Sequence, residues 1–212
     1  MLRIGKNRIS DFLVFATALV LLASTLAQTP WQGDECVYMI TGQEFVRFLL
    51  SQNASALSLH VLRYLHPPSD EAIGLVNHPF LAKLIIGAFL ALGATGVPID
   101  PSSVDCAVWL PTPTQMFWAR IPTTIVAAGA VSAIYAFLHR RFGADVAALG
   151  SLFVLSDLAF LGYSRMAMLD AYAASFLIVA FMHGQSLGLL PREFLLLPAI
   201  SLVSLQCFFG AG

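Results

Sequence analysis

A succession of long apolar runs limits what this chain can fold into. The runs cover residues 12–27, 80–97, 120–138, 146–163, 171–182 and 194–209. Runs of this kind are typical of helices that cross a membrane or lie buried within one. With 58% hydrophobic and 11% charged residues, the 212-residue chain is also too apolar for a soluble domain. We therefore predict an all-α protein, a polytopic bundle of transmembrane helices that occupies residues 1–212 as a single domain.

The first run follows a basic N-terminus, MLRIGKNR, and ends near small residues of the kind found at signal-peptide cleavage sites. Both a signal peptide and a retained anchor fit this pattern. We favour the anchor, because the run is roughly as long as a short spanning helix and the rest of the chain carries further apolar runs.

The distribution of positive charge predicts how these helices are oriented. Cytoplasmic loops of membrane proteins are enriched in Lys and Arg. Residues 96–118 carry two aspartates and no Lys or Arg, which places them outside. Basic residues instead cluster at Arg3, Lys6 and Arg8, at His139, Arg140 and Arg141, and at Arg192. For these clusters to be cytoplasmic, residues 28–117 must form one external loop, in which residues 80–97 lie in or dip into the outer membrane face.

The external loop is itself expected to be helical. Between residues 35 and 65, apolar residues recur at spacings of three and four, which is typical of short amphipathic helices on a membrane surface. The segment HPPSDEAIG that follows is rich in proline and charge and is expected to turn.

The sequence WQGDECVY, a few residues after the first run, contains the clearest candidate for a functional site. Its adjacent carboxylates, Asp34 and Glu35, are costly to desolvate at a membrane face and serve no structural purpose in the sequence pattern. On the predicted topology, further ionisable residues reach the same external face, namely His78, Lys83, Arg120, Arg165 and Asp170. Each of them alone is equally well explained as a side chain that reaches for the interface. Together they predict a polar site.

Four pieces of sequence carry a family resemblance. They are, in order, the DE pair, NHPFLAKLIIG, FWARIPTTIVAAGAVSAIYAFLHRRFG and SDLAFLGYSRMAMLD. In this order they resemble the N-terminal part of the protein O-mannosyltransferases, polyprenyl-phosphate-mannose-dependent enzymes of the GT-C glycosyltransferase superfamily. The resemblance covers nearly the whole chain, with one departure: the family's HPP before LxK reads His78-Pro79-Phe80 here. Because the chain ends at CFFGAG, within what resembles the family's fifth spanning helix, we expect it to be the N-terminal portion of a larger transferase.

The resemblance implies a transfer of mannose, with inversion, from a polyprenyl (dolichyl) phosphate to Ser or Thr hydroxyls of proteins. It further implies that Asp34 is the catalytic base and that Glu35 orients the acceptor or the loop. General chemistry agrees, because an alcohol is a poor nucleophile until a base takes its proton.

A leaving lipid phosphate keeps its negative charge, so the site also needs cationic donors, and Arg binds phosphate oxygens through a planar fork. We therefore expect Arg165 and Arg120 to bind this phosphate, with Lys83 and His78 behind them. Asp170 is expected to pair with a cation at the mouth of the site.

The expected partners are the polyprenyl-phosphate sugar, a protein acceptor and the lipid bilayer, and pairing with a second copy or a paralogue stays open. We expect no cofactor, and no metal because no second cluster of ligands accompanies the DE pair. A net charge of -1 without any basic block argues against nucleic acid. The site is expected on the luminal face of the endoplasmic reticulum membrane in a eukaryote, or on the external face of the plasma membrane in a prokaryote.

Two alternatives to this function stay open. One is a related GT-C transferase that uses another polyprenyl-linked sugar, such as the aminoarabinose transferases that modify lipid A, although the histidine of HPFLAK favours the mannosyl interpretation. The other is a non-catalytic membrane protein, either an assembly partner or a remnant in which the site survives only in part.

The three cysteines and Asp157 also need an interpretation. Cys36, Cys106 and Cys207 match no zinc or CxxC spacing. A disulfide between Cys36 and Cys106 requires an oxidising compartment, and we favour apolar filler instead. Asp157 falls within an apolar run that predicts one continuous helix, where it either shares a face with Arg165 or, as we favour, bonds a polar group of a neighbouring helix.

Overall fold

The structure, a computed structural model, describes residues 4–51, 80–93, 110–167 and 169–186. These residues form seven α-helices and one short 3-10 helix, with no strand among them. The all-α prediction is therefore confirmed for the described part of the chain. The predicted helix at residues 194–209 lies outside the described residues.

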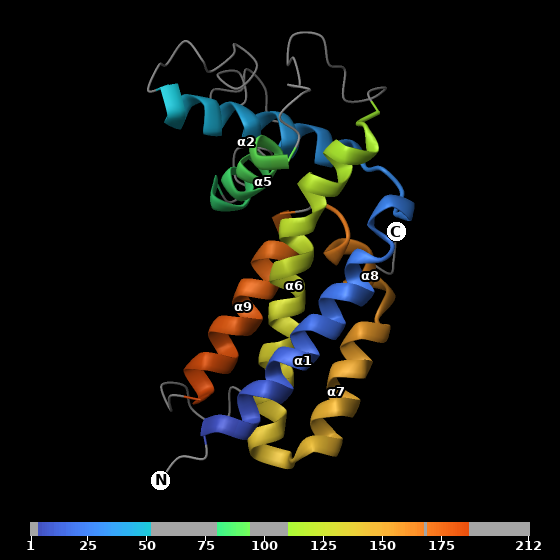
Figure 1. The fold of residues 1–212 in the computed structure, drawn as a ribbon, viewed down its shortest axis with the longest axis vertical. Coiled ribbons are helices and arrows are strands. Elements are labelled where there is room, and N and C mark those ends of the chain that lie inside the picture. The colour runs from blue at the N-terminus through green and yellow to red at the C-terminus, as the bar shows by residue number, and fades with distance from the viewer. Residues whose placement is uncertain (1–3, 52–79, 94–109, 168, 187–212) are drawn as a thin grey trace, which may run out of the picture.

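Four helices run lengthwise in a bundle (Figure 1): α1 (Ile4–Ala23), α6 (Pro113–Phe142), α7 (Ala144–Ser156) and α9 (Leu169–Ser186). α6 is the central helix, because it packs against the other three. Its contact with α1 includes three alanines, with Ala18 and Leu22 in one buried cluster with Ala127, Ala128 and Val131. Small residues let two helix backbones approach closely, as is common between helices in membranes.

α6 has strong start and stop signals in the sequence. The Thr112 side chain accepts a hydrogen bond from the Gln115 backbone N–H, and the Gln115 side chain accepts one from the Thr112 backbone, which completes a capping box. Pro113 occupies the first turn, where its missing N–H costs nothing. Gly143, with a φ of 92°, ends the helix in a conformation that favours glycine. The helix therefore begins several residues before the apolar run that predicted it.

Two helices, α2 (Gly33–Ser51) and α5 (Phe80–Gly93), lie across one end of the bundle (Figure 1). The 3-10 helix η1 (Leu26–Gln28) leads from α1 towards α2. α2 and α5 touch backbone to backbone where Gly42 meets Gly87. The contact is so close that a Cβ atom on either glycine would overlap the main chain of the other helix. The helix predicted in this part of the chain is thus present as α2, but residues 35–42 of α2 are buried, and α5 packs beside it.

The predicted continuous helix over residues 146–163 is wrong. The chain breaks into α7 and α8 (Leu158–Ser164), which meet at an angle of 70°. Asp157 ends α7 and caps α8, where its Oδ1 accepts a 2.7 Å hydrogen bond from the Phe160 N–H. An Asp at this position satisfies an N–H that a helix start leaves unpaired. Asp157 therefore lies at the break in the run and caps α8, and it shares no continuous helix with Arg165.

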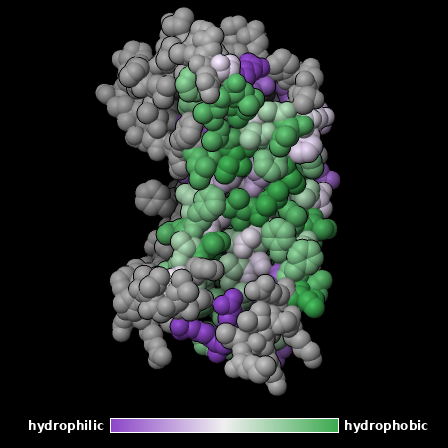
Figure 2. Space-filling model, turned by 60° about the vertical axis from the view of Figure 1, so that its left-hand side comes forward, coloured by the Kyte–Doolittle hydropathy of each residue, from purple (hydrophilic) through white to green (hydrophobic). Residues whose placement is uncertain are grey.

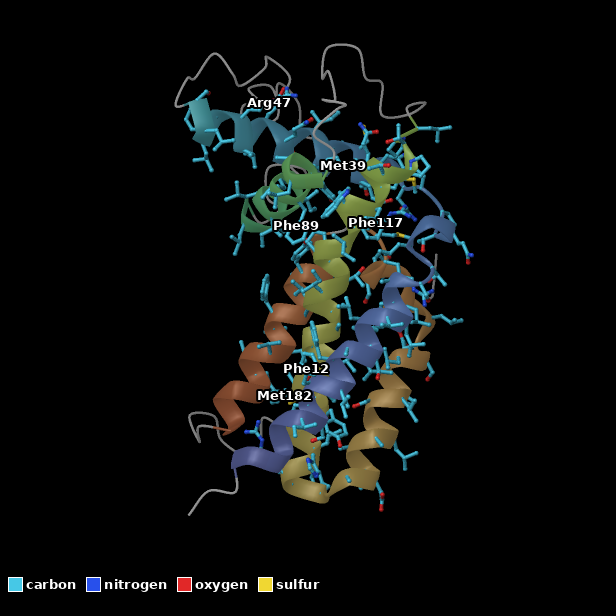
Figure 3. The ribbon with its side chains drawn as sticks, viewed as in Figure 1. Phe12, Met39, Arg47, Phe89, Phe117 and Met182 are labelled. Atoms are coloured by element: carbon cyan, nitrogen blue, oxygen red, sulfur yellow. The ribbon has the colours of Figure 1, made fainter. Side chains whose placement is uncertain are left out.

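Among the described residues, α6 is long and apolar enough to cross a membrane, and the bent pair α7 and α8 counts as a second crossing if taken as one span. Shorter apolar helices occur at Ile9–Ala23, Leu81–Gly93 and Asp170–Met182. The basic last turn of α6 lies at the end of the bundle opposite α2 and α5. Figure 2 shows hydrophobic surface between two ends that carry hydrophilic patches. In Figure 3, Met39 and Phe117 mark the end with α2, and Phe12 and Met182 lie towards the other.

Candidate functional site

Arg120 is fully buried where α6 passes the start of α2, and every donor of its guanidinium group is used. Nε donates to Oε1 of Glu35 at 2.8 Å, and Nη2 donates to Oε2 at 2.7 Å. The remaining bonds go to backbone carbonyls before α2, from Nη1 to Leu26 (2.7 Å) and Thr29 (2.9 Å) and from Nη2 to Pro30 (3.0 Å). Since a guanidinium carries five N–H groups, these five bonds exhaust it.

Glu35, in the first turn of α2, is as deeply buried as Arg120 and equally occupied. Besides the two bonds from Arg120, its Oε1 accepts a 2.6 Å bond from the backbone N–H of Ala167. Its Oε2 accepts a 3.2 Å bond from the N–H of Gln32. Ala167 belongs to the short link between α8 and α9, so this single ion pair joins α6, the segment before α2, the first turn of α2 and that link.

Asp34 differs from its neighbour, because its side chain is exposed at the start of α2. One turn further along the same helix lies Tyr38, which is buried. Burial raises the pKa of Tyr38 to about 12, with help from the negative charges of Asp34 and Asp170. Asp170 is exposed in the first turn of α9. Two exposed carboxylates from different helices therefore lie near one phenol.

Arg165 ends α8 just before the link that Glu35 holds. Its backbone N–H bonds back to the carbonyls of Gly162 and Tyr163, while its side chain is half-buried. The Nε atom is buried without a hydrogen-bond partner. Arg165 thus keeps donor capacity that Arg120 does not have.

Lys83 projects from α5, whose backbone meets α2 at Gly42. Its side chain is buried, and this burial lowers its pKa. An ammonium group with a lowered pKa loses its proton more readily than an exposed lysine does. His78, the remaining candidate, lies outside the described residues.

Cys36 is part of a disulfide bond, which corrects the expectation that it is apolar filler. The other two cysteines, Cys106 and Cys207, lie outside the described residues. Cys36 directly follows Glu35 in the first turns of α2 and is fully buried. A disulfide at this position is typical of a segment that matures in an oxidising compartment.

The structure therefore sorts five of the candidate residues into two groups. Glu35 and Arg120 are joined to each other and have no free hydrogen-bonding capacity, whereas Asp34, Asp170 and Arg165 lie at the same end with exposed or partly unpaired polar atoms. Tyr38 and the Ala167 amide were missed by the sequence reasoning. The i, i+4 spacing from Asp34 could have indicated Tyr38, but a backbone N–H leaves no signal in a sequence. Among the described residues, no group of three or more His, Cys, Asp or Glu side chains is placed to hold a metal ion.

Comparison of this chain with protein-family models, with curated proteins and with solved structures finds no match. The resemblance to the protein O-mannosyltransferases consequently rests on the four quoted motifs.

Proposed function

We propose that this chain carries the catalytic site of a membrane-embedded glycosyltransferase that moves mannose from a polyprenyl phosphate to Ser or Thr hydroxyls of proteins. The observation that carries the proposal is the placement of Asp34, Asp170 and Arg165 at one end of the bundle, with a buried ion pair beside them. These residues supply a base for the acceptor hydroxyl and a cationic group that donates hydrogen bonds to the leaving phosphate. The reaction requires both groups.

In the proposed reaction, Asp34 takes the proton of the acceptor hydroxyl. The hydroxyl oxygen attacks the anomeric carbon of the sugar, and the bond from that carbon to the phosphate oxygen breaks with its electron pair on the leaving phosphate. Arg165 donates hydrogen bonds to that phosphate from the end of α8. The exposure of Asp34 supports its part, because a base must be within reach of an acceptor that arrives from outside.

The surface of the bundle supports a chain that crosses the membrane several times. α6, with 30 residues, is long enough to cross a bilayer, and the apolar part of α1, Ile9–Ala23, runs beside it over part of that depth. Large apolar side chains point outwards on three helices, among them Phe12 on α1, Phe153 on α7 and Leu177 on α9. In a soluble protein such a contiguous apolar surface would promote aggregation, whereas lipid covers it at no cost.

Two observations support an external or luminal site. The basic turn of α6, His139 to Arg141, lies at the end opposite Asp34, as expected if that end is cytoplasmic. The Cys36 disulfide lies at the same end as Asp34, which indicates an oxidising compartment there.

The direct test is transfer by the chain reconstituted in lipid nanodiscs, with polyprenyl-phosphate mannose as donor and a Ser/Thr-rich peptide as acceptor. We expect mannosylated peptide, and we expect Asp34→Asn to lower its formation by about 100-fold, since positioned base catalysis typically contributes 10²–10⁴-fold. Transfer of aminoarabinose to lipid A instead would favour the related transferase. Absence of transfer from either donor would favour the non-catalytic interpretation.

A further inference from the structure

We infer that Arg120 and Glu35 are positioning residues, a buried brace that fixes the turn carrying Asp34 relative to the link between Arg165 and Asp170. This inference rests on the proposed function for its catalytic meaning. It replaces the sequence-based expectation that Arg120 binds the donor phosphate.

The hydrogen bonds of Arg120 carry the argument. A phosphate ligand would have to displace bonds that the guanidinium already makes, because all five N–H groups are used within the protein. Arg120 is also fully buried, so a lipid phosphate would have to enter the packed junction to reach it. Both features suit a residue that holds its neighbours in place.

Glu35 connects the turn that carries Asp34 to the link between α8 and α9. It lies next to Asp34 in the first turn of α2, and it accepts the N–H of Ala167, two residues after Arg165 and three before Asp170. A shift of the Glu35 carboxylate would therefore move the base and loosen the link in the same event. Groups that must be held in register to a fraction of an ångström need this kind of support from residues behind them.

A second contact ties the same link to α6. The Thr124 hydroxyl lies 3.1 Å from two carbonyls, that of Arg120 one turn earlier on α6 and that of Ser164 at the end of α8. Thr124 and Ser164 are both buried. The end of α8 is thus fastened to the Arg120 turn of α6 through Ser164, and the link that follows is fastened to Glu35 through Ala167.

Hydrogen–deuterium exchange of the intact chain in nanodiscs, without donor, tests the brace independently of catalysis. Arg120→Lys leaves Glu35 with one charged donor in place of a planar fork, and Glu35→Gln keeps the side-chain shape while removing its charge. We expect both variants to speed amide exchange across residues 163–170 by about tenfold, and Arg140→Lys, an exposed change at the other end of α6, to leave it unchanged. Should Arg120→Lys fail to accumulate, the Glu35→Gln comparison decides.

Transfer kinetics then separate positioning from phosphate binding. If the two residues form one brace, Arg120→Lys and Glu35→Gln each lower kcat with little change in the KM for the donor, and the double variant is no worse than the poorer single variant. If Arg120 instead binds the phosphate, Arg120→Lys raises the KM for the donor, and the double variant shows the product of the two single-variant losses. Amide exchange measured without donor then does not change. Unchanged exchange overturns the brace, whereas absence of transfer by the parent chain overturns the proposed function and leaves the exchange result standing.

Discussion

Replacing Gly87 with alanine should separate α2 from α5, and the structure indicates how costly this is. The added Cβ would overlap the carbonyl group of Gly42 and the amide of Gln43. Backbone atoms cannot rotate away as a side chain can, so the helices themselves must move. Overpacking of this kind typically costs about 1–3 kcal/mol. Because alanine is favoured over glycine inside a helix by about 0.5–1 kcal/mol, we expect Gly87→Ala to lower the free energy of unfolding by roughly 1–2 kcal/mol.

Gly129→Ala is the matched control, because Gly129 also lies within a helix but a Cβ there meets nothing within 4 Å. We expect this variant to be as stable as the parent or more stable, by up to about 1 kcal/mol. Thermal or denaturant unfolding of the two variants in the same detergent or nanodisc gives the comparison. Equal stability of Gly87→Ala and Gly129→Ala would refute the close backbone contact between α2 and α5.

Three further predictions follow from the orientation and the site. A membrane-impermeant thiol reagent added from outside should label Thr114→Cys and spare Ala144→Cys. Both positions are exposed, Thr114 at the start of α6 and Ala144 just beyond its end, and the reverse labelling pattern would invert the topology. Arg165→Lys should weaken binding of the polyprenyl-phosphate sugar by about 1–3 kcal/mol, as judged by titration, while Asp34→Asn leaves it nearly unchanged; a loss with both variants would contradict the separate roles. The folded chain holds the Tyr38 proton up to about pH 12, and an unfolded chain releases it near pH 10, so stability should fall between these values. Tyr38→Phe should flatten that decline in unfolding experiments, and an unchanged slope would argue against it.

The sequence predicts well that the described residues are helical and that the basic turn of α6 lies at one end of the bundle, away from the DE pair. Both features depend on residues that act locally. The capping residues Thr112 and Gln115 and the terminal Gly143 fix α6 through contacts within a few positions. The concentration of positive charge in the last turn of α6 is visible without any structure. The break at Asp157 was also a local signal, but an apolar run on both sides concealed it.

The difference in hydrogen bonding between the two arginines could not be predicted in this way. Arg120 and Arg165 both lie in motifs that resemble the same family, and both are side chains of the type that binds a phosphate through hydrogen bonds. Their difference depends on contacts across 85 and more residues, from Arg120 to Glu35 and to the carbonyls before α2. The role of the Ala167 amide is equally invisible, because every residue except proline has a backbone N–H.

The backbone before α2 explains why this junction holds an arginine and a glutamate where apolar side chains would pack more simply. A buried ion pair is not by itself stabilising, and apolar residues of similar volume often replace one without loss. Here, however, the chain leaves α1 through an irregular segment whose carbonyls at Leu26, Thr29 and Pro30 all accept bonds from Arg120. Carbonyls that are buried or half-buried outside a regular helix need a donor, and three that converge on one point suit a side chain with several N–H groups. Arginine supplies these bonds, and its buried charge in turn requires the carboxylate of Glu35, so the pair follows from packing this turn against α6.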